Sequence, residues 1–340
     1  MKHSMKLHLN ISIILLVSIL LPACTLPSAA PVKMTRSGFF FDTLVNITIY
    51  GTDDKSLLDD SFELCRQYED LLSMTIASSD IARINSAGTE PVYVSPITMG
   101  ILDAAAGYYR LSDGRLDISV GALSDIWADA RSNDRLPGDD HIADALKHTG
   151  FDRITLDPDK MCVSKSDPGT ALDIGALGKG YIADALKEML TSRGVTSAII
   201  SLGGNIVTIG KKPGEKPFRI GIKRPFSEMT EVAEEVDIWD KSVVTSGVYE
   251  RYIKVDDKIY HHVLDPSTGY PADTDLMSAT IISDSSLDGD ALSTICLLYG
   301  LDRATELINE TPGTEAIFIT WDNELHYTGG ASSYTHSANK

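Results

Sequence analysis

The chain has 340 residues, of which 48 are acidic and 30 are basic, so its formal net charge is −18. This length is sufficient for a large hydrophobic core or for two packed subdomains. The strong acidic excess argues against nucleic acid or a bare anionic membrane surface as the main partner.

The N-terminus has the pattern of a targeting segment. Lys2 and Lys6 precede an apolar run at residues 11–21 that is too short to span a bilayer comfortably. The run ends in Leu21-Pro22-Ala23-Cys24, which resembles a bacterial lipobox. The resemblance implies removal of residues 1–23 as a lipoprotein signal peptide and attachment of lipid to Cys24. An ordinary signal peptide followed by a chance cysteine is the alternative.

Two further segments follow this leader. Residues 24–36, which contain Pro27 and Pro31, are expected to form a flexible tether. Residues 37–334 are expected to form the functional domain, because no repeat and no second linker interrupts them.

Apolar periodicity predicts strands and helices in the remaining chain. Strands are expected at residues 39–50, 197–209, 241–265, 277–283 and 314–327. Residues 197–209 are expected as a strand pair or as one strand bent around Gly203-Gly204, and hairpin turns are expected at Asp256-Asp257 and Asp322-Asn323. Helices are expected at residues 56–74, 95–113, 182–190 and 288–299, with a polar surface loop at 133–140. Because strand runs and helix runs are mixed without a regular βαβ repeat, an α+β fold is favoured over a doubly wound sheet.

A glycine-rich segment at residues 172–184 opens one of these helices. Such a turn points unpaired N–H groups and the positive end of the helix dipole toward an anion, and Lys179 adds a full positive charge. The segment therefore suits phosphate, although its spacing is not that of a P-loop. A tight strand-to-helix turn with a solvated lysine would give the same pattern.

Asp290 and Thr294 lie four residues apart on another predicted helix, so their side chains share one face. Both offer oxygen, which is the ligand type that Mg²⁺ prefers. Alternatively, Asp290 complements the helix dipole and Thr294 bonds back to its own helix.

Several short motifs occur in an order that resembles the ApbE family of FAD:protein FMN transferases. They are the glycine-rich segment, Phe41-Asp42-Thr43, and residues 79–85, 116–121, 201–205, 245–251, 262–271 and 288–294. The resemblance runs from about residue 40 to residue 327. It implies a T-fold-like α+β architecture of two interlocked subdomains, with mixed or antiparallel sheets and flanking helices.

The resemblance also implies which residues bind metal and substrate. Mg²⁺ is expected on Asp290, Thr294 and the backbone carbonyl of Ala176. Contacts with FAD are expected from Phe41, Asp117, Ile118, Ser119, Asp173, Lys179 and Leu264, the last through its backbone. Thr75 stands where many family members have tyrosine, so one flavin-stacking contact is in doubt.

His262 is the only histidine within a family motif. The resemblance makes it the catalytic candidate, which would help to remove a proton from the acceptor hydroxyl. Its neighbour His261 is expected to point to the opposite side of the strand. A hydrogen-bonded histidine that only shapes the following turn is the alternative.

The implied activity is Mg²⁺-dependent transfer of FMN from FAD to a Thr or Ser hydroxyl of an exported flavoprotein, with release of AMP. The implied partners are FAD, an extracytoplasmic acceptor flavoprotein of an electron-transport system, and the bacterial cell membrane, reached through lipid on Cys24. The protein is therefore expected on the extracytoplasmic face of that membrane. Two alternatives remain open: an FAD pyrophosphatase that gives FMN and AMP, and a non-catalytic flavin-binding lipoprotein.

Overall fold

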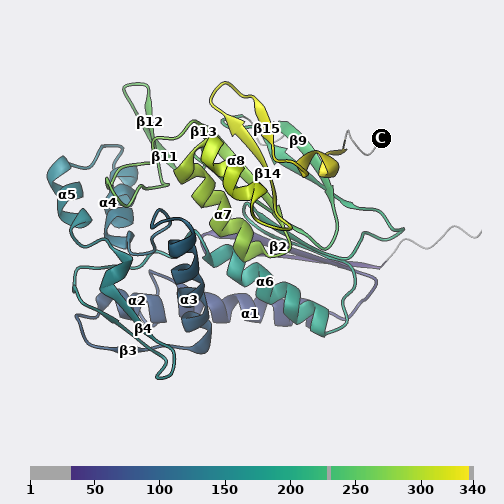
Figure 1. Ribbon diagram of the computed structural model, residues 1–340. Helices are drawn as coiled ribbons and strands as arrows, with labels where there is room; N and C mark the ends of the chain where they lie inside the picture. The colour runs from purple at the N-terminus through teal and green to yellow at the C-terminus, as the bar shows by residue number, and fades with distance from the viewer. Residues whose placement is uncertain (1–31, 228–230, 337–340) are drawn as a thin grey trace, which may run out of the picture. The chain divides into compact units, whose positions relative to one another are not determined.

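The computed structural model in Figure 1 describes residues 32–227 and 231–336. The predicted signal peptide, Cys24 and most of the predicted tether lie outside these residues. The last part of the tether prediction is wrong, because β1 begins at Lys33 and its residues 33–36 pair with residues 47–50. Within the described part, no helix is both long enough and apolar enough to cross a membrane.

The elements follow one another without a regular alternation of strand and helix. The strands are β1 (Lys33–Phe40), β2 (Thr43–Tyr50), β3 (Val92–Tyr93), β4 (Ile154–Asp157), β5 (Cys162–Lys165), β6 (Ala198–Leu202), β7 (Asn205–Ile209), β8 (Phe218–Lys223), β9 (Val232–Ile238), β10 (Ser242–Gly247), β11 (Tyr252–Val255), β12 (Lys258–His261), β13 (Leu276–Ser283), β14 (Glu315–Thr320) and β15 (Leu325–Tyr327). The helices are α1 (Ser56–Leu72), α2 (Asp80–Ser86), α3 (Pro96–Leu111), α4 (Gly121–Ser132), α5 (Asp139–Leu146), α6 (Gly178–Ser192), α7 (Ser286–Tyr299) and α8 (Leu301–Asn309).

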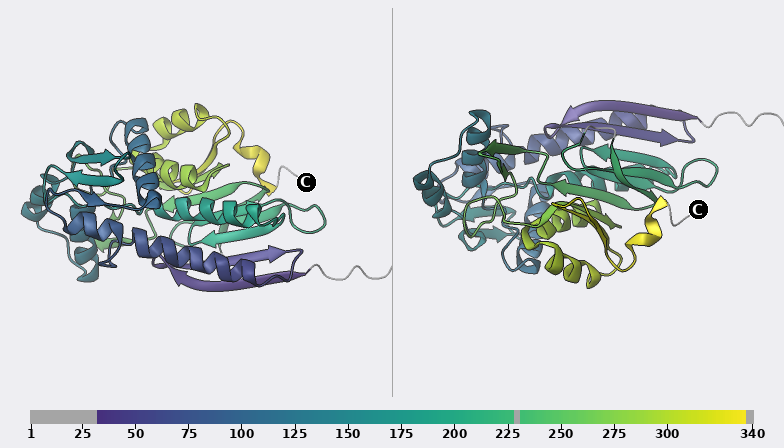
Figure 2. Two further views of the ribbon diagram at one scale, coloured as in Figure 1. Left: turned by 90° about the horizontal axis from the view of Figure 1, so that it is seen from below. Right: turned by 90° about the horizontal axis from the view of Figure 1, so that it is seen from above.

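The largest sheet is antiparallel throughout, in the order β1-β2-β6-β7-β10-β13-β14-β15. Helices α1, α6, α7 and α8 contact one another in that order and cover one face of this sheet. Figure 2 shows α1 running alongside β1 and β2 at the sheet edge. Antiparallel sheets with separately grouped helices are the α+β arrangement that the sequence predicted.

The other face of the sheet is covered by the ribbon of β8 and β9. Tyr50 follows Ile49 in β2 and points to the opposite face, where its ring lies 6.2 Å from that of Phe218. Phe218, Ile220 and Ile222 alternate along β8 and are buried in the main hydrophobic cluster. This ribbon was not predicted from the sequence. The alternation of buried and exposed residues along β8 is the pattern that could have predicted it.

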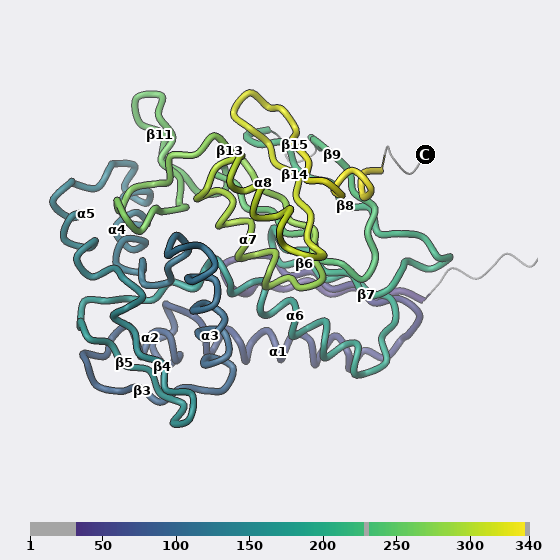
Figure 3. Tube along the Cα trace, in the orientation of Figure 1, coloured from purple at the N-terminus to yellow at the C-terminus, as the bar shows by residue number. Residues whose placement is uncertain are grey.

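Residues 80–177 form a lobe at one end of the sheet, as the trace in Figure 3 shows. The lobe contains α2 to α5 and the small sheet β3-β5-β4. Ile253 and Leu264, which come from much later in the chain, are buried with α4 and α5 in one hydrophobic cluster. The chain therefore leaves the large sheet, forms the lobe, and packs on it again later, which is the interlocking that the family resemblance implied. Neither α4 nor α5 was predicted, and α5 begins inside the expected loop at 133–140.

Helices α6 and α7 meet at their N-termini, and each end receives a carboxylate from the other helix. Asp184 of α6 accepts hydrogen bonds from the backbone N–H groups of Ser286 (2.8 Å) and Leu287 (2.9 Å). Asp290 of α7 accepts one from the N–H of Gly180 (2.8 Å). These bonds satisfy N–H groups that a helix cannot pair internally, and they place negative charge at two positive dipole ends.

The close approach of the two helices requires glycine at position 180. A Cβ there would collide with the carbonyl oxygen of Ser286 and lie 2.7 Å from the Cα of Leu287. We expect Gly180→Ala to lower the free energy of unfolding by about 1–3 kcal/mol, because backbone atoms cannot move aside as a side chain can. Urea denaturation would measure this loss. The matched control is Gly107→Ala in α3, where a Cβ meets nothing within 4 Å. It should raise stability by about 0.5–1 kcal/mol, and equal effects of the two substitutions would contradict this account.

Candidate active site

The glycine-rich segment forms a tight turn that leads into α6. Oδ1 of Asp173 accepts a hydrogen bond from the N–H of Gly175 (2.8 Å), which closes the turn. The ammonium group of Lys179 lies 3.4 Å from the carbonyl oxygen of Gly175 and 3.7 Å from Oδ1 of Asp290. Asp173 and Lys179 therefore stand at the same turn, with a buried carboxylate from α7 beside them.

The segment before this turn is held by two polar residues of the lobe, the half-buried Asn85 and the buried Lys165. The amide of Asn85 donates to the carbonyl of Leu172 (2.9 Å) and accepts from its N–H (2.7 Å). The buried ammonium of Lys165 donates to the carbonyls of Thr170 (2.7 Å) and Asn85 (3.1 Å). Burial lowers the pKa of Lys165 below its usual range, and these carbonyls compensate part of the lost hydration.

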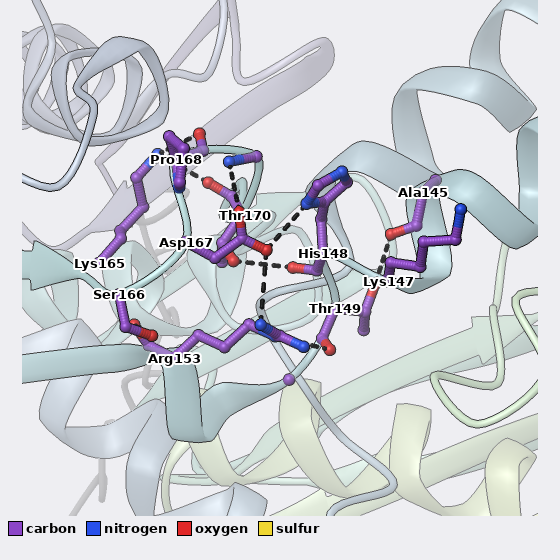
Figure 4. Close-up of polar contacts among 12 residues, drawn as sticks. Ala145, Lys147, His148, Thr149, Arg153, Lys165, Ser166, Asp167, Pro168 and Thr170 are labelled. Atoms are coloured by element: carbon purple, nitrogen blue, oxygen red, sulfur yellow. Dashed lines mark hydrogen bonds and ion pairs between the residues drawn. The ribbon is translucent and has the colours of Figure 1, made fainter.

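Asp167 anchors the loop that carries Thr170, as Figure 4 shows. Its Oδ2 lies 2.8 Å from Nδ1 of His148 and 3.5 Å from Nη1 of Arg153. The hydroxyl of Thr170 donates to the carbonyl of His148 (2.8 Å). Because of these bonds, the approach to the glycine-rich turn is fixed at several points rather than left as a free loop.

The predicted FAD contacts Asp117, Ile118 and Ser119 are buried, and their side chains serve the protein itself. Asp117 accepts from the N–H of Phe151 (3.0 Å), and Ser119 accepts from the N–H of Gly150 (2.6 Å). Burial raises the pKa of Asp117. The side chain of Ile118 lies in the main core, and its carbonyl accepts from the N–H of Asp173 (2.7 Å). This segment thus positions the glycine-rich turn.

The predicted metal ligands come from two helix starts that already touch. Asp290 is only 2 % exposed, and the N–H of Gly180 uses one of its several lone pairs. Thr294 is half-buried one helical turn later, and its hydroxyl donates to the carbonyl of Asp290 (3.3 Å), as the structural alternative expected. Ala176 is half-buried in the glycine-rich turn.

These residues fit Mg²⁺ by the chemistry of their donors. No group of three or more His, Cys, Asp or Glu side chains that could hold a metal occurs in residues 32–227 and 231–336. A metal at this place would therefore bind one carboxylate together with hydroxyl and carbonyl oxygens, and such hard oxygen ligands with added water suit Mg²⁺. Asp290, Thr294 and the carbonyl of Ala176 are a donor set of this kind.

His262 follows the end of β12, and its ring is held by the neighbouring strand. Its backbone N–H donates to the carbonyl of Arg251 (3.0 Å), and its Nδ1 lies 3.3 Å from the same oxygen. Since a carbonyl only accepts, Nδ1 is assigned the proton and Nε2 remains free to accept one. Burial, with the positive charges of Arg251, His261 and Lys179, lowers the pKa of His262 to about 3. His262 is therefore neutral at physiological pH.

His261 points to the other side of the strand, as predicted. It is buried, and its Nε2 lies 3.1 Å from the carbonyl oxygen of Ala272. Its Nδ1 has no hydrogen-bond partner among the described residues. Burial lowers its pKa to about 4.

Phe41 and Leu264 stand apart from the contacts described so far. Phe41 and Asp42 both have positive φ (52° and 56°) in the two-residue turn between β1 and β2, a backbone that suits this tight hairpin. The N–H of Phe41 donates to Glu69 (2.8 Å) in α1. Leu264 is buried against the cluster of α4 and α5. Thr75 is exposed and bonds locally with Ser73.

Two polar side chains near the glycine-rich turn were not assigned from the sequence. Glu250 follows β10, and burial raises its pKa while Lys179 and Arg251 oppose the rise. Glu250 is nevertheless exposed to solvent. Asn205 is buried, and neither its Oδ1 nor its Nδ2 has a partner among the described residues. Asn205 lies in the motif at residues 201–205, and Glu250 lies in the motif at residues 245–251. Their places in these motifs could have marked both residues as candidates for the site.

The fold is that of known flavin transferases. It matches the crystal structure of the ApbE protein from Thermotoga maritima with a TM-score of 0.81 and 30 % sequence identity, covering 89 % of this chain and 99 % of the other. It matches the flavin transferase ApbE from Vibrio cholerae with a TM-score of 0.79 and 25 % identity, covering 90 % of this chain and all of the other.

Sequence comparison identifies the family. The chain belongs to the ApbE family, whose model matches residues 41–318. It is 35 % identical over 273 residues to an FAD:protein FMN transferase of Klebsiella pneumoniae, covering 80 % of this chain and 84 % of the relative. It is 32 % identical over 319 residues to an FAD:protein FMN transferase of Treponema pallidum, covering 88 % of this chain and 87 % of the relative.

The lowered pKa of His261 leads to a prediction of how the free energy of unfolding depends on pH. Because the pKa is about 4 in the folded chain and 6.5 in the unfolded chain, the unfolded chain binds the proton more tightly. The stabilising contribution is therefore present above about pH 6.5 and is lost as the pH falls toward 4. Between pH 7 and pH 5 the loss is about 2 kcal/mol.

Replacement of His261 by a residue that does not titrate should remove this dependence. We expect the difference in unfolding free energy between pH 7 and pH 5 to shrink by about 2 kcal/mol in His261→Gln, measured by urea denaturation at both pH values. His141→Gln changes an exposed histidine and is the control. An identical pH dependence in wild type and His261→Gln would refute the assignment.

Proposed function

We propose that this protein is an FAD:protein FMN transferase that moves FMN from FAD to a Thr or Ser hydroxyl of an exported flavoprotein and releases AMP. The observation that carries the proposal is the convergence of Lys179, Asp290 and the α6 N-terminus at one turn, in a chain of the ApbE family. Such a turn binds phosphate, and FAD contains two linked phosphates.

The reaction is a phosphoryl transfer in which bonds and charge balance. The acceptor oxygen forms a bond to the phosphorus on the flavin side, and the bond from that phosphorus to the bridging oxygen breaks. The hydroxyl proton leaves to a base, and AMP departs with the bridging oxygen. Lys179 and the positive dipole end of α6 stabilise the charge that shifts to the leaving phosphate.

Ala176, Asp290 and Thr294 are the residues that would hold Mg²⁺ beside the pyrophosphate. Bound there, the metal would supply electrostatic stabilisation of the phosphate oxygens during transfer. Asp290 also keeps the first turn of α6 in place through Gly180, so the same carboxylate helps to hold the helix start on which Lys179 stands.

We assign to His262 the role of the base that accepts the proton of the acceptor hydroxyl. Its neutral ring leaves Nε2 free to accept a hydrogen bond from that hydroxyl, while the carbonyl of Arg251 fixes the ring through Nδ1. A pKa of about 3 makes it a weak base in the free protein. Phosphates bound near Lys179 add negative charge and raise this pKa toward the working pH, so His262 becomes a better base when FAD is present.

The targeting pattern at the N-terminus supports a location outside the cytoplasm. We assign the protein to the extracytoplasmic face of the bacterial cell membrane, held by lipid on Cys24, where it meets an acceptor flavoprotein of an electron-transport system. Lipid anchoring keeps enzyme and membrane-bound acceptors on one surface, which raises their effective concentration.

Replacement of Asp290 tests the chemistry. Asp290→Asn keeps an oxygen acceptor for Gly180 but removes the negative charge, so the fold should survive. We expect AMP release and FMN incorporation to fall by roughly a hundredfold or more, because a charged metal ligand is worth several kcal/mol in the transition state. The assay combines FAD, Mg²⁺ and soluble domains of exported proteins from the same organism, followed by intact-mass measurement of each domain.

Several results of this assay would count against the proposal. Asp302→Ala removes an exposed carboxylate in α8 and is the control. Asp290→Asn with wild-type turnover and unchanged Mg²⁺ dependence would remove Asp290 from the site. Wild-type protein that gives AMP and free FMN without a mass gain on any domain would be a pyrophosphatase. Wild-type protein that binds FAD and yields no AMP would be a flavin-binding lipoprotein.

Replacement of Cys24 tests the location. In Cys24→Ala the protein should move from the membrane fraction to the soluble fraction, because it loses the residue that carries lipid. Immunoblots of separated fractions and the intact mass of the mature N-terminus would measure this. Thr25→Ala changes the adjacent residue and should stay membrane-bound. A Cys24→Ala variant that remains in the membrane fraction would exclude lipid anchoring at this position.

A further inference from the structure

Three aromatic side chains gather around the ring of Phe226. The ring centroid of Phe226 lies 5.9 Å from that of Tyr249, 5.5 Å from that of Tyr252 and 5.9 Å from that of Trp321. Phe226 follows β8, Tyr249 and Tyr252 flank the start of β11, and Trp321 follows β14. We call these four residues the aromatic platform.

The platform is unusually open to solvent for such large apolar groups. Phe226 is 42 % exposed, Tyr252 39 % and Trp321 43 %. Exposed aromatic residues that touch one another form a contiguous apolar patch, and such patches on soluble proteins mark interaction sites more often than scattered single residues do. Phe226 also has a φ of 55°, a conformation that is unfavourable for a bulky residue and is retained when surrounding structure or function requires it.

Neighbouring groups fix the positions of Tyr249 and Trp321. A Cβ at position 247 would collide with the ring of Tyr249 and lie 2.7 Å from its Cζ, so the glycine of the Thr245-Ser246-Gly247 motif makes room for it. The indole N–H of Trp321 donates to the carbonyl of Thr274 (2.9 Å). The ammonium of Lys223 lies 5.6 Å from the centre of the Tyr249 ring, within the range of a cation–π contact.

The platform is continuous with the candidate active site. Tyr249 directly precedes Glu250, whose carboxylate interacts electrostatically with Lys179, Asp290 and Lys223. Tyr252 pairs with His261 between β11 and β12, and the carbonyl of Arg251 accepts the N–H of His262. The aromatic surface therefore begins within two residues of the groups that are assigned to the reaction.

A pocket adjoins the platform at Trp321. Trp321 lines a cavity of about 450 Å³ together with Tyr260 and Tyr270. This volume lies within the range of roughly 300–1,000 Å³ that is typical of sites for small ligands. Trp321 belongs to both features, so the pocket and the platform are adjacent.

We propose that the aromatic platform docks the acceptor protein, as an extended segment that lies next to the modified hydroxyl and places a large apolar side chain on Phe226 and Trp321. This inference rests on the proposed function, which requires a polypeptide as second substrate. A polypeptide needs a contact surface beyond the phosphate site, and aromatic residues are the usual anchors of protein interfaces.

The test compares platform variants with a matched exposed aromatic residue elsewhere. Phe226→Gly removes the ring and suits the positive φ, so it should not unfold the protein. Trp321→Ala removes the second anchor. Trp239→Ala is the control, because Trp239 is 50 % exposed and contacts Lys211 rather than the platform. The probe is the exported domain that gains the mass of FMN with wild-type protein.

We expect KM for the acceptor domain to rise by roughly tenfold or more in Phe226→Gly and Trp321→Ala, the effect of losing an interface anchor. The dissociation constant for FAD, followed by flavin fluorescence, should stay within about twofold of the wild-type value. Trp239→Ala should match wild type in both measurements.

The other outcomes overturn the proposal. Unchanged KM in both variants, with active wild-type protein, would refute docking on this surface and leave the proposed function intact. Loss of FAD binding in the platform variants would show that the aromatic platform binds the flavin instead of the acceptor. Loss of binding to phosphatidylethanolamine–phosphatidylglycerol vesicles, with unchanged KM, would make it a membrane contact. If wild-type protein modifies no domain, the proposed function is refuted, and so is the docking of an acceptor on the aromatic platform.

Discussion

The reciprocal capping of α6 and α7 is the contact on which the candidate site depends. Each helix start receives a carboxylate from the other helix, through Asp184 and Asp290. Asp290 also lies 3.7 Å from the ammonium of Lys179. The interaction that joins the two helices therefore also places a cation, a carboxylate and a helix N-terminus together. Stability and function share this carboxylate, so Asp290→Asn, which keeps the cap, separates the two roles better than a truncation would.

The electrostatics of the site differ from those of the whole molecule. The chain is strongly acidic, yet Lys179, Lys223 and Arg251 act together on Glu250, and Lys179 and Arg251 act on His262. Local positive potential near a helix N-terminus can attract a dianionic substrate even when the net charge is negative. The same positive charges, with burial, lower the pKa of His262. Under the proposed function a bound phosphate would offset these charges, so substrate binding and the basicity of His262 would be coupled.

The sequence predicted the parts of the fold that local patterns encode. The bend at Gly203-Gly204 between β6 and β7, and the turn at Asp256-Asp257 between β11 and β12, follow from short turn signals between apolar runs. Contacts between distant segments could not be read in this way. Asn85 holds Leu172 from 87 residues away, so the role of its motif became clear only in the folded chain. For the same reason the hydrogen bonds by which Asp117 and Ser119 hold a neighbouring loop could not be predicted, and their contact with FAD stays a prediction.

In the proposed reaction the two substrates meet at a boundary between two kinds of surface. The phosphate side is polar, and Asp173, Lys179 and Asp290 each contact a backbone group there. The acceptor side, as proposed, is aromatic and exposed, and Glu250 and His262 lie between the two. A transferase must keep water from replacing the acceptor hydroxyl, and exclusion of water from a phosphoryl-transfer site also strengthens its electrostatics. An acceptor segment docked on Phe226 would cover this boundary, so the second substrate would itself exclude the competing nucleophile.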